Sequence, residues 1–436
     1  MKYLSHKRGA AIITAVMFFV IISITFALGL STPVVREYVT SRDFEKSKGA
    51  YYLSESGHED ALYRLKNGKQ ISAEEVLVLE GNTATTTITN VSGYEKFISS
   101  LGDIFKNTRR VKSTLTTSVG ESFSFGVHAG EGGVLLQNSS TITGNLFSAG
   151  PVVGSNNLVS GTVIAAGTTG LNGSITGVQN QGGSSMYAGT ISNSTIAGDA
   201  YCNTISGSST TTCKTLTLQP AQPFPISAAD IANFEAVALA GGTVTCTSGK
   251  YELASNTTLG PAKIPCDFII TGTGTGGGPV ITLGGPLWVT GNIKIKNHVT
   301  VRVDPTLVGQ SIVMIADNPS NHTTSSKIEV EGTGLYFTGA PGGSSWVMLI
   351  SENTGASMGD PNEAIELEQG AQGDVLLYAR LGDILLKNNA SVKEVTAYKI
   401  TLQNSANVIY ASGLQNALFT SGPGGSWVIQ DWKEGQ

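Results

Sequence analysis

Charge is scarce in this chain of 436 residues. Asp, Glu, Lys and Arg make up only 14% of it, and the net charge is −5. Between Gly132 and Cys213 the one charged residue is Asp199. Nucleic-acid binding depends on a patch of basic residues. A chain with few charges and a negative net charge offers no such patch. The composition therefore argues against nucleic acid as a partner.

Histidine and cysteine are also few, and neither has the spacing of a metal site. The five histidines lack patterns such as H-E-x-x-H, and the four cysteines lack C-x-x-C. We therefore expect no metal and no cofactor. The cysteines lie as two local pairs, Cys202 with Cys213 and Cys246 with Cys266. In an exported chain these are most simply two small-loop disulfides, although the sequence leaves other pairings open.

Catalytic motifs are lacking as well. The glycine-rich Thr273–Pro279 has no following Lys-Ser/Thr and is interpreted as a turn. Carboxylates with a basic partner, as in polysaccharide-cleaving enzymes, have candidates at Glu363, Glu366, Glu368, Asp374, Arg380 and Asp383. Glu366 and Glu368 alternate with apolar residues, which is typical of the outer face of a half-buried strand. We predict no catalytic residue.

What the chain does have is a long apolar run, from Ala10 to Leu30, preceded by Lys2, Lys7 and Arg8. Its 21 residues, at about 1.5 Å each, would cover roughly 30 Å, the thickness of the hydrocarbon core of a bilayer. Basic residues on the amino-terminal side predict that this end stays cytoplasmic and that the rest is exported.

Three interpretations of this run compete. One is a cleaved signal peptide, with small residues at Ala27 to Gly29; the second is a plain membrane anchor. The third is a basic leader, residues 1–9, removed between Gly9 and Ala10, with the apolar helix kept. The third is favoured because charges of both signs continue from Arg36 to Lys66 in a helix-like pattern. A membrane and stem helix over residues 10–66 is the prediction.

The amino-terminal 65 residues resemble a known family. The stretches Arg8-Gly9-Ala10-Ala11-Ile12-Ile13 and Tyr51-Tyr52-Leu53-Ser54-Glu55-Ser56-Gly57 are similar to the start of PilX-type minor pilins of type IV pili. They are also similar to the tip pseudopilin of type II secretion. The resemblance implies leader cleavage at Gly9, partners among other pilin-like subunits and the inner membrane as the first location. Pilins normally carry a glutamate where this chain has Thr14, and its absence resembles the tip pseudopilin.

The exported part has short repeated patterns. Leu136 to Ile142 reads apolar, Gln, Asn, two variable residues, hydroxyl, apolar, and similar stretches start at Ile295, Leu386 and Leu402. Asn tolerates the left-handed conformation that a sharp corner between two strands needs. A short helix is predicted between Asp230 and Ala240, after Pro220, Pro223 and Pro225.

These patterns favour a mainly β fold, a parallel β-helix, with a β-sandwich as the alternative. The expected parts are a small α+β region over 67–130, a first solenoid lobe over 131–218, a crossing with a short helix over 219–242 and a second lobe over 243–436. A terminal strand is expected at residues 426–434.

The functional expectation is a non-enzymatic minor or tip pilin-like subunit that displays a β-solenoid at the cell surface. It would serve assembly initiation or adhesion, with a surface, a glycan or a partner cell as ligand. A β-helix carbohydrate-active enzyme and a scaffold-like surface-layer protein are the rivals.

Overall fold

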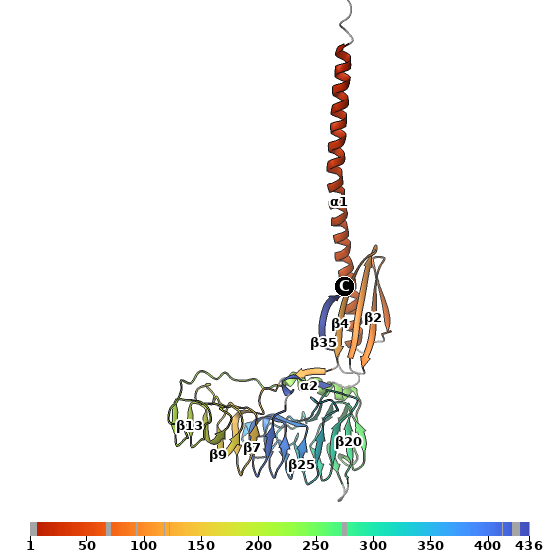
Figure 1. The fold of residues 1–436 in the computed structure, drawn as a ribbon. Coiled ribbons are helices and arrows are strands. Elements are labelled where there is room, and N and C mark those ends of the chain that lie inside the picture. The colour runs from red at the N-terminus through yellow and green to blue at the C-terminus, as the bar shows by residue number, and fades with distance from the viewer. Residues whose placement is uncertain are drawn as a thin grey trace, which may run out of the picture. The chain divides into compact units, whose positions relative to one another are not determined.

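The computed structural model describes residues 7–66, 71–92, 95–116, 118–121, 123–272, 277–411, 413–420 and 428–435. It divides into two units, one of residues 1–116 with 429–436 and one of residues 117–428 (Figure 1). The first six residues of the expected leader, and the start of the expected terminal strand, lie outside the described residues. The fold is mainly β with one long amino-terminal helix, as predicted.

The first unit consists of helix α1 (Lys7–Lys66) and a five-stranded antiparallel sheet. The sheet has the order β1-β2-β3-β4-β35, with bounds β1 (Glu74–Leu79), β2 (Asn82–Ser92), β3 (Glu95–Ile104), β4 (Asn107–Thr116) and β35 (Val428–Gly435). The expected terminal strand is thus present from Val428, but it joins this sheet beside β4. Asp431 accepts a hydrogen bond from the Thr114 backbone N–H at 2.6 Å, and Arg109 pairs with Glu434 at 2.9 Å.

The last third of α1 packs against this sheet through small residues. Gly57 and Gly102 allow the close approach: a Cβ on Gly57 would lie 2.8 Å from the Ala84 Cβ, and one on Gly102 would lie 2.1 Å from the Ala50 carbonyl oxygen. The helix buries Ala50, Leu53, Ser54, His58, Ala61 and Leu62. The Tyr52 side chain, by contrast, is 53% exposed.

The second unit contains a large parallel sheet built of three ladders. One passage of the chain through the three ladders is called a coil, and strands pair with those of the neighbouring coil. Ladder A contains, in spatial order, β16 (Lys250–Leu253), β19 (Asp267–Thr271), β22 (Ile293–Lys296), β25 (Ile328–Glu331), β28 (Ile365–Leu367), β30 (Val375–Leu386), β32 (Glu394–Leu402), β6 (Val127–Leu136), β9 (Val152–Val159), β11 (Ser174–Asn180), β13 (Thr190–Ser192) and β15 (Thr204–Ser206).

Ladders B and C repeat the same order. Ladder B contains β17 (Thr257–Leu259), β20 (Val280–Leu283), β23 (Thr300–Val303), β26 (Tyr336–Thr338), β29 (Gln372–Gly373), β31 (Ser391–Val392), β33 (Asn407–Ile409) and β7 (Thr141–Thr143), and continues onto β9 and β11. Ladder C contains β18 (Ala262–Ile264), β21 (Leu287–Val289), β24 (Ile312–Ala316), β27 (Val347–Ser351), the first halves of β30, β32 and β6, then β8 (Leu146–Ser148), β10 (Val163–Ala165), β12 (Met186–Ala188) and β14 (Ala200–Tyr201). All of these pairings are parallel, unlike those of the alternative β-sandwich.

The chain follows an unexpected path through this sheet. It enters in the middle at β6, proceeds outward to β15, and then starts again at the opposite end with β16. From there it returns coil by coil until β32 pairs with β6 and β33 with β7. The strands of the two expected lobes therefore form one continuous sheet, and all three ladders contribute to one apolar core.

The asparagine corners predicted from the sequence are confirmed. Asn138, Asn297, Asn388 and Asn404 all have left-handed φ angles, of 47°, 48°, 54° and 53°, and each is followed by a second residue with positive φ. Three of these corners stack on neighbouring coils. The Asn138 amide donates to the Asn404 side chain at 2.8 Å, and the Asn404 amide donates to Asn388 at 3.0 Å.

In ladder C, β24, β27 and the first half of β30 are buried on both faces. Their outer face is covered by a second apolar cluster that includes Phe234 of helix α2 (Ala228–Ala240) and Phe419 of β34 (Ala417–Thr420), which pairs with β5 (Ser118–Glu121). Helix α2 matches the predicted short helix. It begins at a capping box, in which the Ser227 and Asp230 side chains each accept from the other's backbone N–H. A crossing segment (residues 215–227) leads to it along the sheet (Figure 1).

The two disulfides lie at the two ends of the parallel sheet. Cys202–Cys213 lies beside β14 and β15, and Cys246–Cys266 lies beside β16 and the start of β19. Each closes a loop at the outermost strands of the sheet. Such loops stabilise by restricting the unfolded chain.

Candidate functional site

The amino-terminal half of α1 is the first candidate functional region. The structure places Gly9, Ala10 and Thr14 within this helix. The large apolar side chains from Ile12 to Leu30 are exposed, Phe19 at 72% and Phe26 at 68%. The helix is long and apolar enough to cross a membrane, with a mean hydropathy of 2.6 over its most apolar 18 residues. These properties are compatible with a membrane anchor. A signal sequence can have the same length and composition.

His58 is the chemically distinctive residue of the other half of α1, and sequence reasoning did not single it out. It is fully buried, lies 2.8 Å from the Ser113 hydroxyl through Nε2, and packs edge-on against the Trp432 ring at 4.6 Å between centroids. Burial lowers the pKa of His58 to about 4. The ring is thus neutral at pH 7 and acts as part of the packing between helix and sheet.

The carboxylates singled out in the sequence do not gather in one groove. Lys387 pairs with both Glu366 and Glu368, at 2.5 and 3.2 Å. The other residues pair separately across neighbouring coils: Asp374 with Lys393, Arg380 with Glu352 and Asp383 with Lys399. Each has a local partner of opposite charge, which is how charges are stabilised on stacked strands. Glu363 forms no ion pair among the described residues and lies near Asp383.

A G-x-S-x-G spacing at Gly355–Gly359 was missed in the sequence. In α/β-hydrolases this motif places a nucleophilic serine on a sharp turn between a strand and a helix. Here the motif forms a single short turn, η1 (Ala356–Met358), and the Ser357 hydroxyl donates to the Thr354 carbonyl at 2.9 Å. Ser357 therefore does not lie on the strand-to-helix turn of a nucleophile elbow.

A charged cluster lies beside helix α2. Glu235 of the helix shares a hydrogen bond with Asp317, which lies 2.6 Å from His322, and Glu352 pairs with Arg380 at 3.2 Å. Burial, then the hydrogen bond and the charge of Asp317, raise the pKa of Glu235 to about 8. Nowhere in the described part of the chain are three or more His, Cys, Asp or Glu side chains placed to hold a metal ion.

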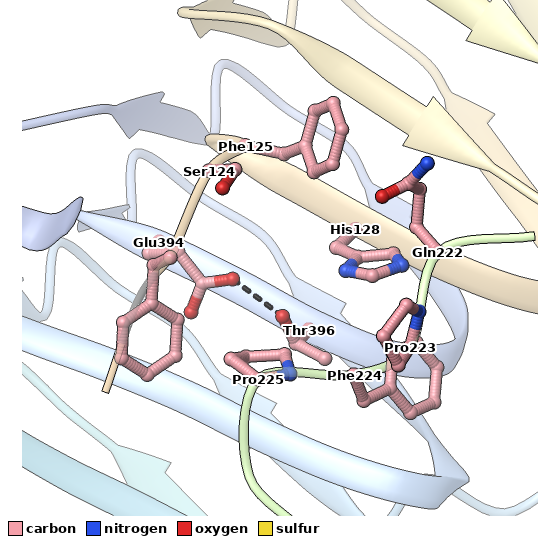
Figure 2. A pocket seen from close by; sticks show the side chains of 10 residues that line it. Ser124, Phe125, His128, Gln222, Pro223, Phe224, Pro225, Glu394 and Thr396 are labelled. Atoms are coloured by element: carbon pink, nitrogen blue, oxygen red, sulfur yellow. Dashed lines mark hydrogen bonds between the residues drawn. The ribbon is translucent and has the colours of Figure 1, made fainter. Parts of the chain in front are cut away.

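The most distinctive concave site lies between the crossing segment and the junction of the first and last coils. It is a pocket of about 420 Å³ lined by residues from three parts of the chain: Phe123, Ser124, Phe125, His128, Gln222, Pro223, Phe224, Pro225, Glu394 and Thr396 (Figure 2). Thr396 of β32 pairs with His128 of β6, so the inner residues come from adjacent strands. The pocket therefore exists because the last coil stacks on the first.

Glu394 and His128 form the buried floor of this pocket, at 1% and 5% exposure. Glu394 Oε1 accepts a hydrogen bond from the Thr396 hydroxyl at 2.5 Å, whereas Oε2 has no partner within the described residues. Burial raises the pKa of Glu394 well above its usual value. Burial also lowers the pKa of His128 to about 4, against the effect of a hydrogen bond to the Gln222 backbone. The His128 ring is consequently neutral at pH 7.

Aromatic rings surround the His128 side chain. The His128 ring lies edge-on to Phe125, Phe147 and Phe224, at 5.5, 5.3 and 4.8 Å between centroids. Sequence reasoning missed this site because its parts are far apart in the chain. One local signal existed: Glu394, at the first position of β32, is the one acidic residue of that strand.

Comparison with protein-family models finds no match, and comparison with curated proteins finds none either. Among solved structures, the chain matches the competence-associated pilin ComZ from Thermus thermophilus, with 12% identity and a TM-score of 0.36. The match covers 89% of this chain and 97% of that one. A similarity this low supports no conclusion about function.

Proposed function

We propose that this chain is a non-enzymatic pilin-like subunit, a minor or tip component of a type IV pilus or of a filament like that of type II secretion. The observation that carries the proposal is the division of α1. Its first half exposes an unbroken apolar surface, and its last third is buried against an antiparallel sheet. A membrane-inserted stem that also packs in a filament needs such a helix.

Two features support a minor or tip position. Thr14 stands where pilins that form the bulk of a filament carry an acidic residue, so this chain lacks the carboxylate that would pair with a neighbouring amino terminus. The second unit is also large compared with the first, since it contains residues 117–428. A subunit with so large an exported part is better placed at a tip than repeated along a filament.

In this proposal the three parallel ladders close into a β-solenoid around their common core. The chain would first reside in the inner membrane with its amino terminus cytoplasmic, with Gly9 and Ala10 as the processing site. It would then associate through α1 with other pilin stems, since small and apolar side chains allow helices to pack in lipid. The solenoid would be displayed at the cell surface, toward a surface or glycan.

The mature amino terminus tests this proposal. Mass spectrometry of the full-length protein from its own membrane should give a first residue of Ala10. A Gly9→Leu variant, with the bulkier residue at the processing site, should keep the leader. A start near Leu30 would instead establish a cleaved signal peptide and contradict the proposal, and an uncleaved leader in the natural chain would support a plain anchor.

A further inference from the structure

The floor of the pocket contains an incomplete carboxyl group. Glu394 is almost fully buried, and its Oε2 lacks a hydrogen-bond partner among the described residues. An unsatisfied buried polar atom destabilises the folded state. Glu394 lines a pocket of about 420 Å³, which has room for a ligand of several heavy atoms (Figure 2). Because Oε2 itself is not exposed, a group that enters the pocket would reach this atom after a shift of the lining side chains.

The lining of the pocket selects the charge of that group. No lysine or arginine is present among the described lining residues, so an anion would meet no positive charge. The neutral His128 ring donates one N–H to the Gln222 backbone, which leaves its other nitrogen as a hydrogen-bond acceptor. Phe123, Phe125 and Phe224 are among the lining residues, and aromatic rings attract cations placed over their faces.

From these observations we propose that the pocket binds a small organic ammonium ion, held by the carboxylate of Glu394, by acceptor atoms of the floor and by the phenylalanine rings. The positive charge of the ligand would replace the proton as the partner of the buried carboxyl group. A neutral hydroxylated ligand is the competing possibility, since it could bind the protonated acid. This proposal rests on the pocket alone and would stand if the filament assignment failed.

The two possibilities differ in their dependence on pH. Burial raises the pKa of Glu394, so an ammonium ion competes with a proton for this carboxyl group. Its affinity should then rise by up to about tenfold per pH unit between pH 6 and 8. The other titratable groups near Glu394 are His128 and Tyr410, which stay neutral over this range, while Lys393 pairs with Asp374 at 3.8 Å.

Isothermal titration of the full chain in detergent tests the proposal with three probes. Butylammonium carries three N–H donors, choline carries a charge without such donors, and butanol is a neutral control of matched length. We expect saturable binding of butylammonium that strengthens as the pH rises, weaker binding of choline and none of butanol.

Two variants and one control complete the test. Glu394→Gln keeps the shape of the protonated acid and should reduce butylammonium affinity by at least about tenfold, because no charge can form. Phe125→Leu keeps an apolar side chain without the ring and should reduce it about threefold. Glu131→Gln, an exposed change on the same strand β6, should have no effect.

Three results would overturn the proposal. These are the absence of cation binding at millimolar concentration, binding of butanol as tight as that of butylammonium, and butylammonium binding that Glu394→Gln leaves unchanged. Thermal melting of each variant checks that its fold is retained. None of these measurements involves processing or assembly, so a failure here leaves the proposed function untouched.

Discussion

Val127, on the first strand of the parallel sheet, pairs in parallel with Val395, on the last coil. The sheet therefore has its earliest and latest strands side by side in its middle, and its two ends are formed by chain segments from between them. This relationship explains why the disulfides lie at the ends and why the pocket lies at the junction.

The stacked asparagine corners give a first prediction. Asn404 has a φ of 53° and forms hydrogen bonds to Asn138 and Asn388. Asn404→Ala loses the hydrogen bonds and strains the backbone, so it should lower the free energy of unfolding by about 2 kcal/mol. Asn404→Gly keeps the left-handed conformation at low cost and should lower it by roughly half as much. If thermal melting gave the same loss of unfolding free energy for both variants, the backbone conformation would contribute nothing.

The disulfides give a second prediction, about the ends of the sheet. Replacing Cys246 and Cys266 by serine should destabilise the chain by about 2–4 kcal/mol. It should also increase hydrogen exchange in β16–β18 before the middle of the sheet. The matched control is the Cys202 and Cys213 double variant, which should affect β14 and β15 instead. An increase spread evenly through all coils would contradict this account.

Gly102 gives a third prediction, on the contact between α1 and its sheet. A Cβ at this position would lie 2.1 Å from the Ala50 carbonyl and 2.7 Å from the Ser54 nitrogen, both backbone atoms of the helix. Gly102→Ala should therefore destabilise the first unit by about 3 kcal/mol or more, as overpacking does. The exposed Thr87→Ala on the adjacent strand is the control. Unchanged proteolysis between α1 and β1 in Gly102→Ala would refute the packing described here.

Helix α2 gives a fourth prediction, about pH. The folded-state pKa of Glu235 is raised to about 8, from 4.5 when unperturbed. The folded form with a neutral carboxyl is thus fully favoured below pH 4.5, and that stabilisation is lost as the pH rises through 8. The melting temperature of the natural chain should fall relative to Glu235→Gln between pH 5 and 9, whereas Glu131→Gln should follow the natural chain. If the melting temperatures of the natural chain and of Glu235→Gln changed in parallel with pH, this result would argue against a buried, protonated Glu235.

Local features of the fold could be predicted from the sequence because they depend on neighbouring residues. The left-handed corners at Asn138 and Asn404 and the helix near Asp230 follow from the preferences of a few adjacent side chains. The apolar run from Ala10 to Leu30 likewise predicts a long helix by length and composition alone.

The order of the coils could not be predicted, because it depends on pairing between distant strands. Nothing local in Val127 indicates that Val395 is its partner, and nothing local in Val428 indicates a place beside β4. The pocket was missed for the same reason. Phe224, His128 and Glu394 meet only after the chain has turned back on itself.

The most direct test of the central claim is the amino terminus of those copies of the chain that occur in filaments. Filaments sheared from cells that express the chain should contain it in small amounts relative to the main subunit. Mass spectrometry should show that those copies begin at Ala10, with α1 complete. Absence of the chain from the filaments, or copies that begin near Leu30, would contradict the account.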